Sequence, residues 1–441
     1  MSELGGRLVL GAYQAAGYAA LPIVPAILSW RTSRGKEDPV RRSERYGHAS
    51  LPRPPGRLVW VHAASVGETN AVLPLVSRIV DEGIGVLFTT VTVTGAATAL
   101  KGLPKGAIHQ FAPLDIKPFV GRFLANWRPD LALFVESEIW PVTMRRLAEA
   151  EVPQVLVNAR LSERSFERWQ KFGDATRMLF GQISLCLAQS EVDGARYGHL
   201  GVKKVTVTGN LKFDVPPPFA DPEMVKGFEA ALAGRTVWVA ASTHEGEEEV
   251  IAAAHRVLRH RRRELLTIIV PRHPNRGPEI AEALSRRGFS VALRTRNDAI
   301  HEETDVYVAD TLGELGLFYR LTPIAFLGGS LVPHGGQNPI EPVRLDTAVL
   351  HGPHVHNFAD IYAALDRAGR AEVVRSSEGL AKALDELFAD PTAMRRRATK
   401  AAEALSSFSG ALDATMRALS PYLQPIAVAS RLDDRLSRAR T

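Results

Sequence analysis

Val-Pro-Pro-Pro-Phe-Ala-Asp-Pro, residues 215–222, divides the 441-residue sequence into two halves of similar character. Such a proline cluster does not fit inside a helix or strand, because proline has a fixed φ angle and no amide donor. It is typical of a semi-rigid linker. We therefore expect the chain to pass from one domain to another here, which agrees with a length of roughly 100–200 residues per domain.

Short apolar runs alternate with helical patterns on both sides of this linker. The runs before it are 58–61, 86–89, 131–135, 155–157 and 205–207, and those after it are 237–239, 266–270, 306–308, 324–327 and 349–350. Continuous apolar runs of this length are typical of strands that are buried on both faces. Their alternation with helices predicts βαβ units, and hence an α/β protein with two Rossmann-like parallel sheets.

The N-terminal segment has a different character. Residues 8–30 contain no charged side chain, which is near the ~20 residues needed to cross a bilayer. Pro22 and Pro25 interrupt the run, and Arg31, Arg34 and Lys36 follow it. The positive-inside rule places these cations, and the chain after them, in the cytoplasm. We expect residues 1–35 to anchor the protein to a membrane by spanning or dipping into it, with a buried helix pair as the alternative.

The overall composition narrows the function classes. Hydrophobic residues make up 45% and charged residues 23% of the chain, as in ordinary globular proteins. The single cysteine, Cys186, excludes an intrachain disulfide and lies in an apolar run that predicts a buried, inert thiol. The net charge of +6 suits anionic lipids or phosphorylated substrates. No basic tail, zinc spacing or RNA-binding signature accompanies it, so nucleic acid is not an expected partner.

A capping residue followed three positions later by glutamate recurs after the predicted strands. The four occurrences are Ser65 to Glu68, Ser242 to Glu245, Thr311 to Glu314 and Asn338 to Glu341. Each predicts a capping box that opens a helix, and this purely structural role would by itself explain the glutamate. In a parallel α/β sheet, however, the same helix openings at the strand ends are where phosphate groups bind.

The second half has the stronger anion-binding pattern. Gly328-Gly-Ser330 follows a predicted strand and precedes His334-Gly-Gly-Gln-Asn-Pro-Ile-Glu341, and such glycines let a backbone approach a ligand closely. Arg272 follows another strand, where its planar guanidinium suits a phosphate. Neither a G-x-G-x-x-G nor a GK[ST] motif occurs, which argues against NAD and ATP. The histidines at 351, 354 and 356 lack a completing Cys or carboxylate cluster, so we expect no metal site.

The first half carries acidic groups at its strand ends. Glu136 and Glu138 directly follow the apolar run 131–135, where carboxylates are costly unless they are solvated, paired or functional. Together with Glu68 they are expected on one rim, where one could act as the general base for a sugar hydroxyl. Lys212 lies just before the linker and is either a functional cation near the cleft or a surface charge paired with Asp214.

An ordered set of motifs carries a resemblance to a known family. The set comprises Ser43-Glu-Arg-Tyr-Gly47, Ser65-Val-Gly-Glu68, Glu136-Ser-Glu-Ile-Trp-Pro141, Asn158-Ala-Arg-Leu-Ser162, Gly209-Asn-Leu-Lys-Phe-Asp214, Ser242-Thr-His-Glu-Gly-Glu247, Pro271-Arg-His-Pro274, Gly328-Gly-Ser-Leu331, His334-Gly-Gly-Gln-Asn-Pro-Ile-Glu341 and Gly352-Pro-His354. Nearly end to end, the chain resembles the bacterial 3-deoxy-D-manno-octulosonic acid (Kdo) transferases of lipopolysaccharide core biosynthesis. One position departs from the family pattern, because Val142 stands where Trp-Pro is usually followed by Asn.

The resemblance implies a GT-B fold, with two Rossmann-like domains facing a central cleft. It also implies transfer of Kdo from CMP-Kdo to a tetraacylated lipid A precursor at the cytoplasmic face of the inner membrane. We predict that the reaction inverts the anomeric carbon, and we expect no metal or cofactor because the chain has no Asp-x-Asp pair to hold a metal. The expected segments are a membrane anchor (1–35), an acceptor domain (36–214), a linker (215–222), a CMP-Kdo domain with a C-terminal helix packing back (223–419) and a tail (420–441).

The resemblance also assigns roles to individual residues. Glu68 would be the general base, and Glu136 and Lys212 would assist the transition state. The expected donor-binding residues are Pro271, Arg272, Leu312, Gly313, Glu314, Asn338, Pro339, Ile340 and Glu341, together with Ser242, Thr243, His244, Gly329 and Ser330. The expected residues on the acceptor or Kdo-carboxylate side are Ser65, Gly67, Glu138 and Arg160.

Two other functions are compatible with the pattern alone. A nucleotide-sugar epimerase can share the GT-B architecture, but its soluble substrate gives no reason for an apolar N-terminus. A non-catalytic, membrane-associated binder of nucleotides or lipid headgroups would leave Glu68, Glu136 and Lys212 without a role. Deletion of the residues before Ser33 distinguishes the epimerase, which should keep full activity without detergent, and release of CMP from a CMP-sugar in the presence of a lipid acceptor distinguishes the binder.

Overall fold

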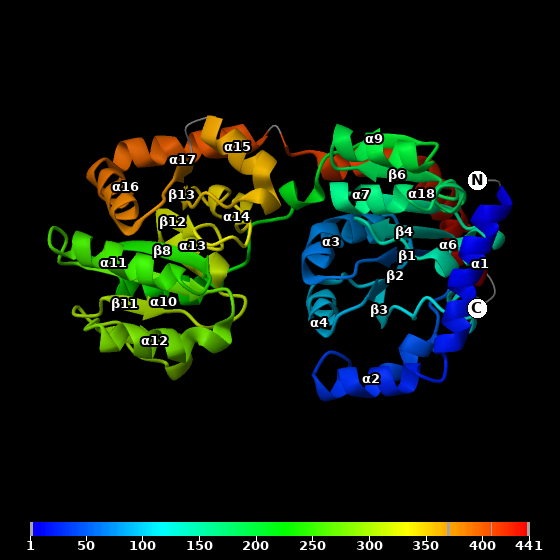
Figure 1. The fold of residues 1–441 in the computed structure, drawn as a ribbon, viewed down its shortest axis with the longest axis horizontal. Coiled ribbons are helices and arrows are strands. Elements are labelled where there is room, and N and C mark those ends of the chain that lie inside the picture. Colours follow the sequence, from blue (N-terminus) through cyan, green and yellow to red (C-terminus); the bar gives the residue numbers. More distant parts are fainter. Residues whose placement is uncertain (1–2, 368–370, 407, 439–441) are drawn as a thin grey trace. The chain divides into compact units, whose positions relative to one another are not determined.

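The computed structural model describes residues 3–367, 371–406 and 408–438, and it comprises two compact units (Figure 1). The first unit contains Met1–Val215 together with Phe408–Thr441, and the second contains Pro216–Ser407. The chain therefore changes unit at the start of the proline cluster and returns near residue 408. Each unit is a parallel sheet covered by helices, as strand–helix alternation predicts.

The first unit is built on a seven-stranded parallel sheet in the order β3-β2-β1-β4-β5-β6-β7. Its first six positions follow the Rossmann order, in which the chain winds outward from β1 and then crosses back to β4. The strands are β1 (Leu58–His62), β2 (Gly85–Thr90), β3 (Ala107–Phe111), β4 (Leu131–Val135), β5 (Gln154–Ala159), β6 (Leu185–Ala188) and β7 (Val205–Val207).

Helices cover both faces of this sheet. Apolar residues of α3, α4 and α18 pack on one face, and those of α5, α6, α8 and α9 pack on the other. The helices of this unit are α1 (Glu3–Ala20), α2 (Val24–Ser33), α3 (Val66–Asp81), α4 (Val93–Gly102), α5 (Lys117–Trp127), α6 (Pro141–Glu149), α7 (Glu163–Gln170), α8 (Asp174–Phe180), α9 (Glu191–Leu200) and α18 (Ala411–Arg438), with short 3-10 turns η1 (Arg42–Tyr46) and η2 (Leu211–Phe213).

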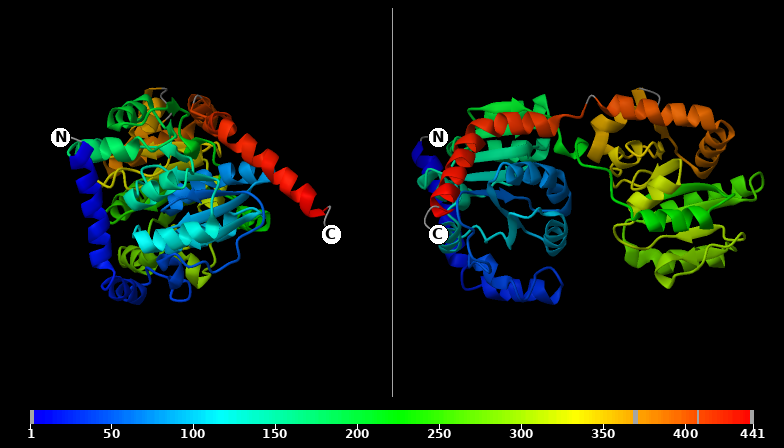
Figure 2. Two further views of the ribbon diagram at one scale, coloured as in Figure 1. Left: turned by 90° about the vertical axis from the view of Figure 1, so that its right-hand side faces the viewer. Right: turned by 180° about the vertical axis from the view of Figure 1, so that it is seen from behind.

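The segment expected to be a tail from residue 420 is instead part of α18, which runs across one face of the first sheet (Figure 2). Leu419, Leu423 and Ile426 of this helix are buried in the same core as α3. The boundary expected at residue 419 is also displaced, because the chain returns to the first unit at Phe408. The apolar face of α18 explains both differences, since its burial on the first sheet fixes the whole helix there.

The second unit has a seven-stranded parallel sheet in the order β10-β11-β9-β8-β12-β13-β14. Its strands are β8 (Thr236–Thr243), β9 (Leu265–Pro271), β10 (Val291–Leu293), β11 (Val306–Val308), β12 (Ile324–Leu327), β13 (Ala348–His351) and β14 (Ala371–Val373). Its helices are α10 (Pro222–Ala231), α11 (Glu247–Arg259), α12 (Gly277–Arg286), α13 (Leu315–Leu321), α14 (Ile340–Val343), α15 (Ala359–Arg367), α16 (Ser377–Ala389) and α17 (Pro391–Ser406), with 3-10 turns η3 (Pro274–Arg276), η4 (Arg294–Arg296) and η5 (His356–Phe358).

All ten strands expected from the apolar runs are present, and four further strands were not predicted. The additional strands are β3, β6, β10 and β14, of which β10 and β14 lie at the edges of the second sheet. The predicted buried thiol is confirmed, since Cys186 is fully buried in β6. Its burial raises the pKa of the thiol well above its usual range, so it is a poor nucleophile at neutral pH.

The N-terminal segment forms two helices rather than one continuous span. Among the described residues, no single helix is long and apolar enough to cross a membrane, but Leu4–Ala20 and Val24–Ser33 together meet that test across a bend of 69°. Helix α1 packs closely on α8. At Gly6 the two helices approach so closely that an added Cβ would lie within 3.0 Å of Met178 and Ala175. The pair nevertheless exposes large apolar side chains, namely Leu4, Leu8, Tyr13, Tyr18, Ile23, Ile27 and Trp30.

Candidate active site

The acidic residues of the first unit lie at the point where its sheet reverses its winding. The loop after β1 leads to Glu68 in the first turn of α3, and Glu136 directly follows β4. Strands β1 and β4 are hydrogen-bonded neighbours, so their carboxyl ends adjoin. Open α/β sheets bind ligands at such a switch point, which makes these loops the candidate acceptor-side site.

Glu68 is held at the start of α3 by a capping arrangement. Ser65 is the N-cap and accepts a hydrogen bond from the Glu68 amide, while the Glu68 carboxylate accepts bonds from Ala64 N at 2.7 Å and Ser65 Oγ at 2.8 Å. Burial and the nearby carboxylates of Glu136 and Glu138 raise the pKa of Glu68. An ionised carboxylate can accept about four hydrogen bonds, so the capping role leaves capacity for a substrate hydroxyl.

Glu136, which follows β4, forms an ion pair with Lys212, which lies in η2 after β7. Lys212 Nζ donates a 2.8 Å hydrogen bond to Glu136 Oε1, and both side chains are partly buried. This contact corrects the alternative in which Lys212 pairs with Asp214, whose carboxylate accepts bonds from the amides of Gly410 and Leu412. Glu136 has φ of 57°, a left-handed conformation that is costly outside glycine and often marks a functional site.

Glu138 completes the carboxylate group of this rim. Its Oε2 accepts a 2.7 Å hydrogen bond from Trp140 Nε1 and lies 3.5 Å from Nε2 of the buried His62. Burial acts to raise the pKa of Glu138, but the contacts with His62 and Trp140 outweigh it and bring the pKa below its usual value. The rim thus contains one carboxyl group whose pKa is raised, Glu68, and one whose pKa is lowered, as in sites that separate a base from a charge stabiliser.

The remaining first-unit candidates are less constrained. Gly67 is exposed beside Glu68, with open space where a side chain would be. Arg160 is also exposed, and no carboxylate within the described ranges forms an ion pair with it, although its carbonyl accepts a bond from the Tyr197 hydroxyl. Both are therefore accessible to a ligand.

The switch point of the second unit lies between β8 and β12, and a buried glutamate holds it together. The Glu247 carboxylate, at the start of α11, accepts bonds from the amides of Gly329 (2.7 Å), Ser330 (3.0 Å) and Leu331 (2.9 Å). It also accepts a bond from His244 N at 2.9 Å. Glu247 is fully buried, and this clamp fixes the loop after β12 against the loop after β8.

This clamp changes the roles that were predicted for neighbouring residues. The amides of Gly329 and Ser330 are already occupied by Glu247, so they are not free to bind a phosphate. The Ser330 hydroxyl donates to Leu327 O and accepts from Gly352 N at 2.7 Å, and the residue is fully buried. Thr243 is also buried, where its hydroxyl donates to Glu248. These residues shape the loops, whereas the strand-end side chains remain the candidates for ligand contact.

Cationic and aromatic side chains surround this switch point. Arg272 follows β9 and is exposed, and its charge acts on both His244 and Glu341. The His244 and His334 rings stack with centroids 4.2 Å apart, and His273 lies edge-on to His244. Burial and these neighbours lower the pKa of His244 to about 4, so its ring is neutral near pH 7.

Three of the four expected capping boxes differ from the prediction. The helix after Ser242 begins at Glu247 with Gly246 as N-cap, because Ser242 adopts a φ of 56° in a bulge at the end of β8. At α13, Glu314 is itself the N-cap, and its carboxylate pairs with Arg294 at 2.8 and 3.0 Å, which lowers the pKa of Glu314. Leu312, next to Gly313, is largely exposed.

The fourth box, at Asn338, is only partly formed. Asn338 accepts a bond from Ile340 N and donates one of 3.2 Å to Glu341, while Pro339 is the N-cap of α14. Burial raises the pKa of Glu341, against the opposing effects of Asn338 and Arg272. Because α14 spans only Ile340–Val343, its dipole is small, and we assign the main attraction for an anion to Arg272.

The histidines around residue 351 have structural partners. His351 is buried, with Nδ1 2.8 Å from Gly352 O and Nε2 3.1 Å from Asp366. In the part of the chain that the structure describes, no group of three or more His, Cys, Asp or Glu side chains is arranged to hold a metal ion.

Comparison with known proteins decides the family. Residues 40–215 match the family described as 3-deoxy-D-manno-octulosonic-acid transferase (kdotransferase). The 3-deoxy-D-manno-octulosonic acid transferase of Haemophilus influenzae is 35% identical over 407 residues, covering 90% of this chain and 94% of that protein. The Bordetella pertussis transferase is 36% identical over 414 residues, covering 89% and 95%. This chain belongs to the Kdo transferase family.

The family assignment agrees with the fold. The UDP-GlcNAc 2-epimerase of Neisseria meningitidis has a TM-score of 0.57 at 13% identity, covering 82% of this chain and 99% of that structure. At that identity the likeness concerns the fold alone, which is the GT-B type with two parallel-sheet units. As a Kdo transferase, the protein is a glycosyltransferase of lipopolysaccharide biosynthesis.

The residues that sequence reasoning missed in this Kdo transferase act through distant partners. Glu247 lies in the motif 242–247, but its role is not predictable from neighbouring residues because its partners Gly329 and Ser330 lie more than eighty positions away. His62 and Arg294 were not considered, since neither lies in a motif with a recognisable spacing. A signal existed for His62 alone, as a polar residue at the end of the apolar run 58–61.

Proposed function

We propose that this Kdo transferase uses CMP-Kdo as donor and a tetraacylated lipid A precursor (lipid IVA) as acceptor, with inversion at the anomeric carbon and without a metal ion. The observation that carries the proposal is Glu68, a carboxyl group at the switch point of the first sheet whose pKa is raised by burial. A general base with this property suits abstraction of a proton from a sugar hydroxyl near neutral pH.

In the proposed step, the Glu68 carboxylate takes the proton of the acceptor hydroxyl while that oxygen attacks the anomeric carbon of Kdo. The bond between this carbon and the phosphate oxygen breaks, and CMP leaves with the electron pair. Attack opposite the leaving group inverts the configuration. Lys212, positioned by Glu136 at 2.8 Å, supplies a positive charge that can stabilise the Kdo carboxylate or the developing negative charge.

We assign donor binding to the second unit. The exposed Arg272 guanidinium can grip the CMP phosphate with two hydrogen bonds, which is stronger than a single neutral contact. Glu341 and Asn338 lie beside it and can bond ribose hydroxyls, and the exposed Leu312 can cover a base. The Glu247 clamp keeps this surface in shape.

We propose that α1 and α2 attach the enzyme to the cytoplasmic face of the inner membrane. Ile23, Ile27 and Trp30 expose roughly half of their surface on this pair, and the cationic Arg31 and Arg34 follow them. Apolar side chains next to basic ones are the pattern of interfacial helices that bind anionic lipid. An acceptor with acyl chains would be reached at this surface.

The assay for the reaction combines purified protein, CMP-Kdo and lipid IVA in detergent, with chelator present or absent. We expect lipid product heavier by whole Kdo units, CMP released in equal amount, inverted linkage by NMR and no effect of the chelator. CMP release without sugar-bearing lipid would contradict the acceptor, retention of configuration would contradict direct displacement, and loss of activity with chelator would contradict metal independence.

Membrane attachment is tested separately by flotation with vesicles that contain anionic phospholipid. We expect wild-type protein to float with the vesicles, and the triple variant Ile23→Ser, Ile27→Ser, Trp30→Ser to remain largely free. Val257→Ser is the matched control, because Val257 is similarly exposed but lies on α11 of the second unit. Equal flotation of all three proteins would contradict the proposed surface.

A further inference from the structure

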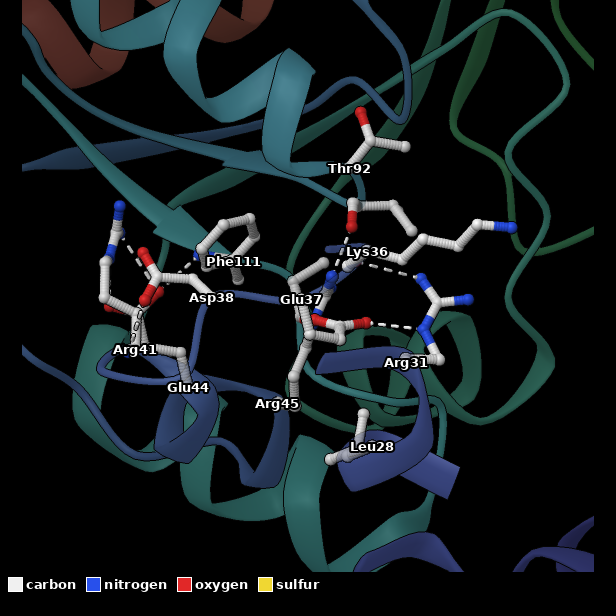
Figure 3. A network of polar contacts seen from close by, with 12 residues as sticks. Leu28, Arg31, Lys36, Glu37, Asp38, Arg41, Glu44, Arg45, Thr92 and Phe111 are labelled. Atoms are coloured by element: carbon white, nitrogen blue, oxygen red, sulfur yellow. Dashed lines mark hydrogen bonds and ion pairs between the residues drawn. The ribbon is translucent and has the colours of Figure 1, made fainter. Parts of the chain in front are cut away.

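The segment between α2 and β1 contains buried charged side chains. Residues 36–55, at the start of the expected acceptor domain, bury Glu37, Glu44 and Arg45 almost completely. The motif Ser43-Glu-Arg-Tyr-Gly47, to which the proposed function gives no role, forms the turn η1. Figure 3 shows two groups of charged side chains, Arg41 with Glu44 and Arg31 with Glu37 and Arg45.

Glu37 lies at the centre of this network and joins two arginines. Its Oε1 accepts a 2.8 Å bond from Arg31 at the end of α2, and its Oε2 accepts a 2.9 Å bond from Arg45. Glu37 and Arg45 are both almost fully buried. A buried pair of this kind adds little stability, because its desolvation offsets most of the attraction, so its main effect is to fix the segments that it joins.

Arg45 extends from Glu37 to the loops at the ends of β2 and β3. Its Nη1 donates to Ala112 O at 3.1 Å, and its Nη2 donates to Val91 O. The guanidinium also lies over the Phe111 ring, 4.8 Å from the centroid. Arginine places these donors on three separate nitrogens of a rigid planar fork, whereas the three donors of a lysine all lie on one nitrogen at the end of a flexible stem.

The loop held by Arg45 is in turn bonded to the segment that holds Glu68. The Val91 amide donates to Ala64 O at 3.4 Å, and the Thr92 hydroxyl reaches the same oxygen at 3.4 Å. The Ala64 amide donates to Glu68 Oε2 at 2.7 Å. Contacts therefore run without a break from Arg31 of α2 through Glu37, Arg45 and Val91 to Ala64 and Glu68.

A second set of contacts makes this connection rigid. The Glu44 carboxylate accepts bonds from Arg41 and from Phe111 N at 2.6 Å, so η1 is tied to β3 independently of Arg45. Gly47 has φ of 81°, and a Cβ there would lie 2.0 Å from Phe119 O. The turn thus requires glycine at this point and is packed directly against α5.

We propose that Glu37 and Arg45 are positioning residues of the transferase, and that they transmit the placement of α2 to the catalytic carboxylate Glu68. The proposal rests on the proposed role of Glu68 as general base. Its physical content is that Arg45 fixes the loop at Val91, which fixes Ala64 and hence the orientation and desolvation of the Glu68 carboxylate. A base displaced by about 1 Å can lose roughly 100-fold in rate.

The test compares Arg45→Lys, Glu37→Gln and Arg31→Gln with wild type in the detergent assay. Arg45→Lys keeps the charge but replaces the three separate donor nitrogens that reach Glu37, Ala112 and Val91 with a single one, whereas Arg31→Gln cuts only the link to α2. Arg78→Gln is the matched control, because Arg78 forms an exposed ion pair with Asp413 from the same helix as Glu68. Circular dichroism and melting curves establish the folded fraction of each variant.

We expect kcat to fall roughly 10- to 100-fold in Arg45→Lys and Glu37→Gln, less in Arg31→Gln, and not at all in Arg78→Gln, with KM for the donor unchanged. The acid limb of the kcat–pH profile is the readout that a purely structural role would not move. The groups that act on Glu68 are Glu136 and Glu138, which themselves contact Lys212 and His62. Because looser packing admits water, the pKa of Glu68 falls and the acid limb moves to lower pH.

The proposal is overturned if folded Arg45→Lys and Glu37→Gln keep kcat within twofold of wild type, or if kcat falls only in proportion to the folded fraction while the acid limb stays in place. Unchanged kcat in Arg31→Gln would overturn the link to α2. Glu68→Gln is measured in parallel to separate the two proposals. If Glu68→Gln keeps full turnover, its role as base fails; if it is inactive while Arg45→Lys behaves as wild type, only the positioning proposal fails.

Discussion

The Lys212 ammonium donates a 2.8 Å hydrogen bond to Glu136 Oε1 and so joins two residues 76 positions apart in the first unit. Glu136 directly follows β4, and Lys212 lies in η2 after β7. Leu211, beside Lys212, is fixed by a bond of 2.9 Å from its amide to Asn158 Oδ1, and Asn158 has φ of 54°. Glu136 and Asn158, both in the left-handed conformation, therefore fix the Lys212–Glu136 ion pair at the rim. Such costly backbone conformations are typical of functional sites.

A double-mutant cycle of Glu136→Gln and Lys212→Met measures this pair. We expect each single variant to lower kcat/KM, and the double variant to lose less than the sum of the two losses, with a coupling of roughly 0.5–3 kcal/mol. Steady-state kinetics of the four proteins gives the coupling directly. Strictly additive losses would show that Lys212 and Glu136 act independently.

Replacing Glu247 tests the clamp of the second unit. Glu247→Gln removes the charge that accepts four backbone amides, so we expect a lower melting temperature and weaker CMP binding by calorimetry. Glu249→Gln is the control, because Glu249 is exposed on the same helix and pairs with Arg287 at the surface. If the two variants melt and bind alike, the clamp does not shape the donor site.

Arg272 is predicted to dominate recognition of the donor phosphate. Removing a charged hydrogen-bonding partner costs about 1.5–3 kcal/mol, so Arg272→Met should raise the Kd for CMP by roughly 10- to 100-fold. Cytidine lacks the phosphate, and its affinity should change little. Arg286→Met, an exposed arginine of α12, serves as the control. A similar loss for cytidine and CMP would mean that Arg272 shapes the site without contacting phosphate.

The pH dependence of kcat follows from the environment of Glu68. Burial and the charges of Glu136 and Glu138 raise its pKa, and the base acts as the carboxylate, so kcat should rise with pH through a value above that of an ordinary glutamate. Glu138→Gln removes one like charge without touching the Glu136–Lys212 pair. Its acid limb should therefore lie at lower pH than that of wild type. An unmoved limb would show that another group controls ionisation.

Most of the strands and the cap at Ser65 could be predicted from the sequence, because both depend on neighbouring residues. The alternation of apolar runs predicted ten of the strands, and the Ser65–Glu68 spacing predicted the cap that the structure shows. The same spacing at Ser242 was misleading. Ser242 has a left-handed backbone conformation in a bulge, and the helix begins only at Glu247. Gly246 is therefore the N-cap, and the carboxylate at the start of the helix is that of Glu247.

Burial of charge and of distant helices was not visible in the sequence. Glu37 and Arg45 lie in a stretch rich in charged residues, which is typical of an exposed segment. Only the fold shows that the two side chains are buried and form an ion pair. The last helix was misread as a tail from residue 420, because Pro421 and Pro425 interrupt its pattern. Its apolar side chains, Leu419, Leu423 and Ile426, fit the first sheet in spite of both prolines.

The central claim is that Glu68 is the base that transfers Kdo from CMP-Kdo to the lipid acceptor, and single-turnover mass spectrometry of the lipid product tests it most directly. Wild type should convert the acceptor to a product heavier by Kdo, whereas Glu68→Gln should form it about 10²- to 10⁴-fold more slowly while binding CMP with unchanged affinity. Formation of the product by Glu68→Gln at the wild-type rate would contradict the account and leave Glu68 as a helix cap.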